Sequence, residues 1–121
     1  MSINLPEFQA AKHPIPLADA IKMTQKYRLG NETILEPVMR NMQILPFSET
    51  FNREDFDKLL SQADCEGIRL YYGMDEELKV HIIAVGVNSR NEDLIADQVA
   101  VLIENGIRCP TVCPPASALN S

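Results

Sequence analysis

The sequence predicts an α+β fold: a small, mainly antiparallel three-stranded sheet with helices packed on one face. Apolar residues recur at helical spacing in the first third of the chain, and they alternate or run together in segments near its middle. The composition, 45% apolar and 23% charged over 121 residues, is that of a folded domain with its own core. We therefore expect residues 1–121 to form a single domain.

The first third of the chain is expected to contain an extended arm followed by a helix. Residues 1–15 contain two prolines and little periodicity, so the N-terminal arm (1–15) should be extended. A helix should begin at Pro16, because proline suits a first helical position, and end at Gly30-Asn31. Its apolar face comprises Leu17, Ala20, Ile21, Thr24 and Tyr27.

A second apolar stripe keeps helical spacing through Pro37. It comprises Ile34, Leu35, Val38, Met39 and Met42. Proline removes a backbone donor and clashes with the preceding turn, so this helix should be kinked or begin close to Pro37. Because the two stripes are nearly in phase, one long bent helix is an alternative.

The clearest local signal begins at Phe51. Asn52 can cap a helix by accepting from backbone N–H groups, and Phe51 and Phe56 have the spacing of a hydrophobic staple. Helix is therefore predicted from Arg53 to Gln62. Its buried stripe comprises Phe56, Leu59, Leu60 and Ala63.

Three segments are predicted to form the sheet. The first lies near Leu45, where Pro46 makes it an edge or irregular strand. Gly67–Gly73 alternates as a half-buried strand does, and Lys79–Val87 is apolar on both faces in its second half, as a central strand is. With a turn over Met74–Glu77 between them, the last two segments should pair antiparallel.

The last third is predicted to hold one more helix and a tail. A capping box over residues 89–92 precedes an apolar stripe of Leu94, Ile95, Val99, Leu102 and Ile103. Residues 99–103 could alternatively form a strand, and Asn105-Gly106 ends the element. Three prolines in the C-terminal tail (107–121) predict that it lies extended but ordered against the domain, because proline reduces the entropy lost on ordering.

Charge and hydropathy exclude several classes of partner. The net charge is −6, and the segment Ser48–Leu78 carries nine acids against three bases. Nucleic-acid binding needs basic side chains that neutralise phosphates, so no nucleic acid is expected as a partner. No apolar run approaches the roughly 18 residues of a membrane span, and the start does not resemble a secretory signal. We expect a cytoplasmic protein without a membrane partner.

No familiar catalytic motif is present. The five glycines are dispersed and form no phosphate loop, and the two histidines lie in different predicted elements, so no two-histidine metal motif exists on one helix. His81 alternates onto the face of Ile83 and Val85, near a strand end, and is interpreted as a partly exposed packing residue. We expect no cofactor and favour a protein that is not an enzyme.

The cysteines are the one cluster of reactive residues. Cys109 and Cys113 lie four positions apart in a proline-rich segment, each followed by a proline, with Cys65 distant in sequence. Arg108 could activate a thiol, but the spacing is neither that of a zinc knuckle nor Cys-x-x-Cys, and an intracellular compartment keeps thiols reduced. Structural or incidental cysteines are the favoured interpretation. A thiol, redox or metal-dependent protein that uses Cys109 and Cys113 is the alternative.

Two short segments resemble a group of small uncharacterised bacterial proteins. They are Cys65-Glu66-Gly67-Ile68-Arg69-Leu70-Tyr71 and the tail Cys109-Pro110-Thr111-Val112-Cys113-Pro114. Those proteins have a similar strand, a following hairpin and a Cys-Pro-x-x-Cys-like tail that ends near Leu-Asn, here Leu119-Asn120. The cysteine gap here is three residues instead of two. The resemblance implies no activity, cofactor or site residue for this chain.

The favoured function is a non-enzymatic protein-interaction or regulatory module. Catalytic constellations are absent, while Met23, Met39, Met42 and both faces of Ile82–Val87 supply apolar surface. The alternative is that the methionines fill the core. A homodimer formed through the helical half, or an unidentified protein partner, is the form this function would take.

Overall fold

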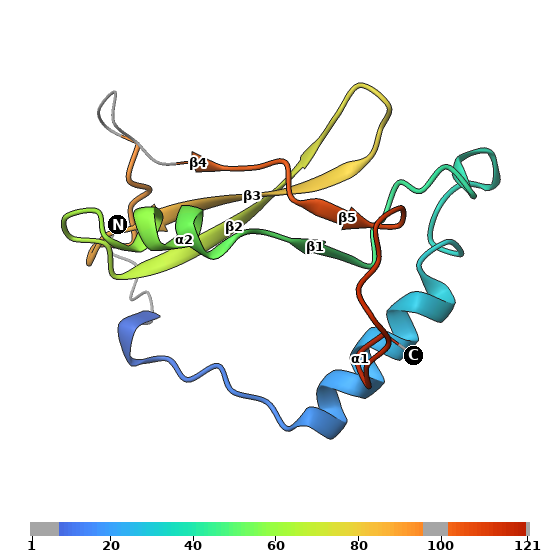
Figure 1. The fold of residues 1–121 in the computed structure, drawn as a ribbon, viewed down its shortest axis with the longest axis horizontal. Helices are drawn as coiled ribbons and strands as arrows, with labels where there is room; N and C mark the ends of the chain where they lie inside the picture. Colours follow the sequence, from blue (N-terminus) through green and yellow to red (C-terminus); the bar gives the residue numbers. More distant parts are fainter. Residues whose placement is uncertain (1–7, 96–101, 121) are drawn as a thin grey trace, which may run out of the picture.

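The computed structural model describes residues 8–95 and 102–120, and it has the predicted α+β architecture with antiparallel sheets (Figure 1). The elements in order are a 3-10 turn (Phe8–Ala10), α1 (Leu17–Gly30), a second 3-10 turn (Pro37–Met39), β1 (Ser48–Thr50), α2 (Arg53–Leu60), β2 (Gly67–Met74), β3 (Val80–Val87), β4 (Leu102–Ile103) and β5 (Ile107–Cys109). Within the described residues, none of the helices has the length and apolarity that crossing a bilayer requires.

The β2–β3 hairpin confirms the antiparallel pairing predicted from the sequence. Every residue of β2 has a partner in β3, beginning with Gly67 opposite Val87. Asp75 shapes the turn, because its Oδ1 accepts from the N–H groups of Glu77 at 2.8 Å and Lys79 at 3.0 Å. The observed turn therefore begins at Asp75, one position later than predicted.

The third strand of this sheet is not the one predicted. In the described residues the strand order is β2-β3-β4, and a second sheet pairs β1 with β5. The segment near Leu45 forms no strand; Ile44 O accepts from Val80 N–H at 2.8 Å. Pro46 has no N–H with which to extend a ladder, and from Phe47, whose N–H bonds to Cys109 O at 2.7 Å, the chain pairs with β5 instead.

The helix predicted after the sheet is wrong where the structure describes it. Leu94 is not helical and donates its N–H to a carbonyl of β3, while residues 96–101 lie outside the described residues. Leu102–Ile103 forms β4, in agreement with the strand alternative. The predicted capping box at residues 89–92 is a turn, because the side chain of Asn88 accepts from two of its N–H groups.

The stripe over residues 34–42 does not form a helix, so neither a second helix nor one long bent helix is present. Only Pro37–Met39 makes a short 3-10 turn. The guanidinium of Arg40 donates to the carbonyls of Glu32 and Leu35, which a continuous helix would use itself. Asn41 has a φ of 66°, in the left-handed region, which stops helical growth.

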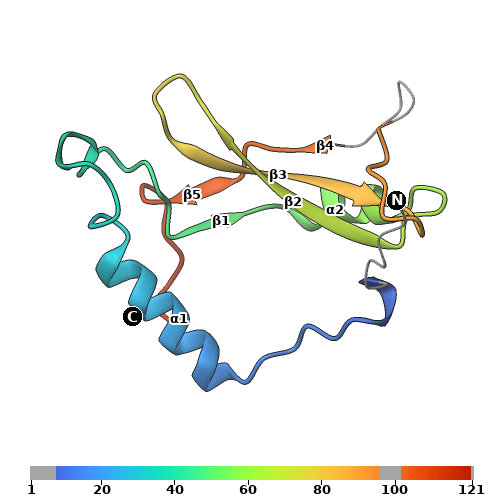
Figure 2. The same cartoon turned by 180° about the vertical axis from the view of Figure 1, so that it is seen from behind.

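The two helices have different surroundings. α2 packs against β3 and β4, whereas α1 lies beside the C-terminal tail (Figures 1 and 2). Tyr27 Oη donates to Pro46 O at 2.8 Å, and the Arg28 guanidinium donates to Leu119 O. The tail is therefore ordered against the chain as predicted, although its first three residues form β5. That α1 also covers a face of the three-stranded sheet stays a prediction.

The cap and staple predicted for α2 are confirmed. Asn52 Oδ1 accepts from Asp55 N–H at 2.9 Å, and the rings of Phe51 and Phe56 meet edge to face with centroids 5.6 Å apart. These contacts fix the start of α2 and turn its apolar side toward the sheet. The core forms there from Leu59, Ala84 and Ile103, whereas Leu60, predicted to be buried, is half exposed.

Candidate functional site

Cys109 and Cys113 form a disulfide, with Cα atoms 4.4 Å apart. The chain reverses directly after β5, where Val112 N–H bonds to Arg108 O at 3.0 Å, and this turn returns Cys113 to Cys109. The expectation that an intracellular compartment leaves these thiols reduced is therefore corrected. Cys65 is free and packs against the core at α2, so the structure does not bring it to the other two.

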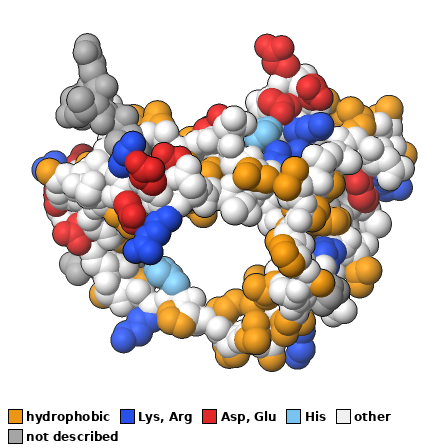
Figure 3. All heavy atoms as spheres, in the orientation of Figure 1, with side chains coloured by type: hydrophobic (Ala, Val, Ile, Leu, Met, Phe, Trp, Pro, Cys, Tyr) orange, Lys and Arg blue, Asp and Glu red, His pale blue; other side chains and the backbone are white. Residues whose placement is uncertain are grey.

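The disulfide lines a groove of about 870 Å³ between α1, β1 and the C-terminal tail. Its apolar lining includes Met23, Tyr27, Phe47, Pro114 and Leu119. In the space-filling view, hydrophobic side chains gather over α1 and the tail (Figure 3). Such a surface can hold apolar groups.

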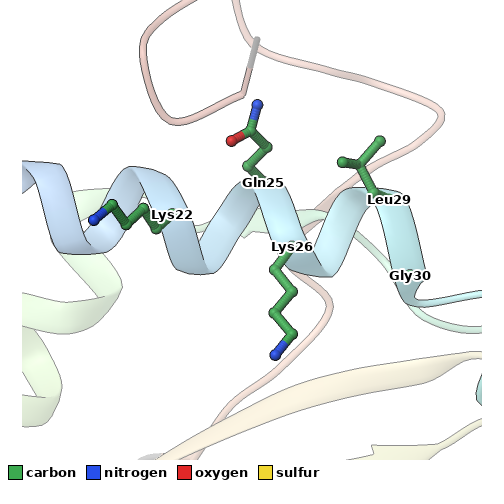
Figure 4. Close-up of a pocket in the computed structure, with 5 residues that line it drawn as sticks. All are labelled: Lys22, Gln25, Lys26, Leu29 and Gly30. Atoms are coloured by element: carbon green, nitrogen blue, oxygen red, sulfur yellow. The ribbon is translucent and has the colours of Figure 1, made fainter.

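A second hollow lies on α1 alone. Lys22, Gln25, Lys26, Leu29 and Gly30 line it, and Figure 4 shows Lys26 on the opposite side of the helix from Gln25 and Leu29. A binding site needs polar groups that converge on one ligand. This hollow is therefore no candidate site.

Glu49 is the centre of a buried polar cluster that the sequence did not reveal. Its side chain has no solvent exposure, and Oε1 lies 3.7 Å from His81 Nδ1 and 3.8 Å from Arg108 Nε. Both carboxylate oxygens lie within hydrogen-bonding range of Ile82 N–H, at 3.3 and 3.4 Å. The carboxylate thus occupies the position along β3 that a neighbouring strand would otherwise fill.

His81 extends this cluster toward solvent. Its Nε2 lies 2.8 Å from Asp75 Oδ2, and this hydrogen bond, helped by backbone N–H groups of Lys79 and Glu77, lowers the pKa of the Asp75 carboxyl. The His81 side chain is 16% exposed, so the predicted partly exposed position at the strand end is confirmed. Its position between two carboxylates was not foreseen.

The cluster is enclosed and is therefore assigned a structural role. Arg108 Nη2 donates to Gln43 O and Ile44 O, each at 3.1 Å, while Arg108 Nε and His81 Nδ1 are buried and face Glu49 without a hydrogen bond of normal length. A catalytic carboxylate must reach a substrate, and Glu49 is sealed from solvent. Among the described residues, no group of His, Cys, Asp and Glu side chains could hold a metal ion.

Comparison with known proteins adds no assignment. No protein-family model, curated protein or solved structure matches the chain. The function has to be argued from the geometry.

The lowered pKa of Asp75 predicts a loss of stability in acid. A carboxyl whose folded pKa lies below its ordinary value of 3.8 contributes stability above that pH and loses it as the pH falls through the folded pKa. The free energy of unfolding of the Asp75→Asn variant should therefore be lower than that of the parent at neutral pH, and the two should converge as the pH falls below the folded pKa of Asp75. Urea unfolding from pH 2 to pH 7 measures both, with Glu76→Gln in the same turn as control. Parallel curves for parent and Asp75→Asn would contradict the assignment.

Removing the charge of Glu49 should destabilise the fold strongly. Glu49→Gln keeps the shape and one acceptor for Ile82 N–H but leaves Arg108 buried without a counter-charge, which costs on the order of 3–5 kcal/mol in buried ion pairs. Urea unfolding at pH 7 gives the value. Glu77→Gln is the matched control, because its ion pair with Lys79 is exposed and exposed pairs contribute about 0–1 kcal/mol. An equal decrease in the free energy of unfolding in the two variants would contradict the special role of Glu49.

Proposed function

We propose that the protein is a non-enzymatic interaction module that self-associates as a homodimer through its helical half, α1 and the segment that follows it. The observation that carries the proposal is the exposed surface. The chain exposes 9322 Å², whereas a compact monomer of 13.6 kDa exposes about 6,600 Å². The difference exceeds the roughly 1,000–2,500 Å² that each subunit of a stable homodimer buries.

Much apolar surface is concentrated in the helical half. α1 has no buried residue, and Met23 and Met42 are 65% and 41% exposed, so these two methionines do not fill the core. Other large apolar side chains exposed here are Leu17, Leu29, Ile34 and Val38. Figure 3 also shows an open gap through the molecule beside α1, which adds to the exposed surface.

A second copy is the occupant that fits this surface. In a two-fold symmetric dimer the same patch lies on both subunits, so it must be compatible with itself. Met23, Ile34, Val38 and Met42 are uncharged and exposed, and methionine side chains adapt to irregular neighbours. Burial of such side chains yields about 25 cal/mol for each Å².

Light scattering tests the proposal directly. At tens of micromolar the parent should have twice the mass of one chain, and Met23→Glu/Val38→Glu should be monomeric, because both residues are exposed and their charges would meet in the interface. Lys22→Glu, an exposed change on the same helix, is the matched control and should stay dimeric. A monomeric parent, or a dimer that the double variant leaves intact, would refute dimerisation through this surface.

Thiol chemistry at Cys109 and Cys113 is a second candidate, favoured by the disulfide itself. Cys109 is buried whereas Cys113 is exposed, so an external thiolate would attack the Cys113 sulfur and release Cys109 as the thiolate. The S–S bond breaks, a mixed disulfide forms at Cys113, and a second thiol from the reductant completes the two-electron reduction. The disulfide also argues against the cytoplasmic location expected from the sequence, because the cytosol keeps thiols reduced.

Mass spectrometry with oxidised glutathione tests this candidate. We expect the Cys109→Ser variant to form a mixed disulfide at exposed Cys113 at least about tenfold faster than the Cys113→Ser variant forms one at buried Cys109. Cys65 is present in both variants and is the internal control. Equal rates at the two positions would argue against directed exchange.

The variant that lacks both Cys109 and Cys113 should remain folded. Its free energy of unfolding should fall by about 2 kcal/mol, because the loop that the disulfide closes is short.

A further inference from the structure

β2 has an open edge. Within the described residues it is the outer strand of its sheet, with β3 on one side and no strand on the other. It is eight residues long, contains no proline and has a single charged residue, Arg69, which is bonded to Asp93 at 2.5 Å. Proteins usually protect an edge strand with prolines, bulges or several charges, because its free backbone groups pair readily with another strand.

The hydrogen bonds of β3 show which groups of β2 are free. The N–H groups of Val80 and Ile82 are bonded on the far side of β3, away from β2. Residues that face each other in an antiparallel pair turn their backbone groups either toward each other or apart. Their partners in β2, Met74 and Tyr72, therefore direct their backbone N–H and C=O groups toward the free edge. Because this direction alternates along a strand, the backbone groups of Leu70 and Ile68 also point to the free edge.

The same four residues present apolar side chains to solvent. Ile68, Leu70, Tyr72 and Met74 lie on one face of β2 and are between 40% and 78% exposed. A strand added at this edge would place its alternate side chains beside them. In both ribbon views the first half of β2 borders the gap between the sheet and residues 8–16, and Figure 3 shows that the gap stays open when side chains are drawn.

Acidic residues flank the edge at both ends. Glu66 precedes β2, and Glu76 and Glu77 project from the hairpin tip, where Figure 3 shows acidic side chains gathered. A second copy pairing antiparallel through β2 would bring one tip beside the other copy's Glu66, which like-charge repulsion disfavours. A strand with basic residues at its ends is complementary instead.

We propose that the free edge of β2 binds an extended peptide segment of another protein, apolar at alternate positions and basic at both ends, by addition as a fourth strand. Backbone hydrogen bonds along the edge hold the peptide, the apolar face of β2 selects its alternate side chains, and the terminal acids fix its ends. This site is separate from the helical surface, so it does not rest on the homodimer.

Fluorescence anisotropy tests the proposal with a labelled synthetic peptide of alternating valine and threonine with two lysines at each end. Leu70→Pro removes an outward N–H that the sheet does not use, so the hairpin should fold while peptide affinity falls at least about tenfold. Leu70→Val keeps the N–H and is the matched control, and circular dichroism verifies the fold of both. Glu76→Lys/Glu77→Lys should weaken this peptide and strengthen one that ends in glutamates.

Three outcomes would overturn the proposal. Equal affinity of parent and Leu70→Pro would place the peptide elsewhere, and equal affinity for lysine-ended and glutamate-ended peptides would remove the role of charge. If Leu70→Pro dissociates the dimer and Met23→Glu/Val38→Glu leaves it intact, the occupant of this edge is a second copy of the chain. A monomeric parent that binds the peptide would refute the homodimer alone.

Discussion

The buried carboxylate of Glu49 is the contact on which the joining of the two sheets depends. It belongs to β1, faces Arg108 of β5 in the register of the smaller sheet, and reaches His81 and Ile82 of β3 in the larger one. β4 pairs with only two residues of β3, so the adjoining stretch of that edge has no strand beside it in the described residues. A carboxylate supplies the acceptor there, and its buried charge lies beside the guanidinium of Arg108.

Glu49 and the hydrogen bond from Val80 N–H to Ile44 O join the two parts of the chain, and much of the chain around them stays exposed. The smaller sheet is short, and α1 is held beside it by contacts such as Tyr27 to Pro46 and Arg28 to Leu119. The core around Leu59 belongs to the larger sheet, and α1 contributes nothing to it. The helical half thus carries exposed apolar side chains of its own, apart from the core of the larger sheet.

The sequence predicted the elements whose causes are local. α2 follows from a cap and a staple within six residues, and the hairpin from an alternating strand before the turn and a continuous apolar run after it. The stripe at residues 34–42 has helical spacing but does not form a helix. The Arg40 side chain bonds to a backbone carbonyl that a helix would use, and Asn41 has a left-handed backbone conformation. Glu49 could not be found at all, since nothing in its neighbourhood signals that β5 and β3 converge on it.

The disulfide and the junction are linked through Arg108, and this joins the two candidate functions. Arg108 precedes Cys109, accepts the N–H of Val112 at its carbonyl and directs its guanidinium to Glu49. Opening the Cys109–Cys113 bridge would free the turn that holds this carbonyl in place, next to the groove lined by α1 and the tail. The bridge therefore lines the groove and, through Arg108, adjoins the buried carboxylate of Glu49. The core of the larger sheet, at Leu59, Ala84 and Ile103, contains neither cysteine of the bridge.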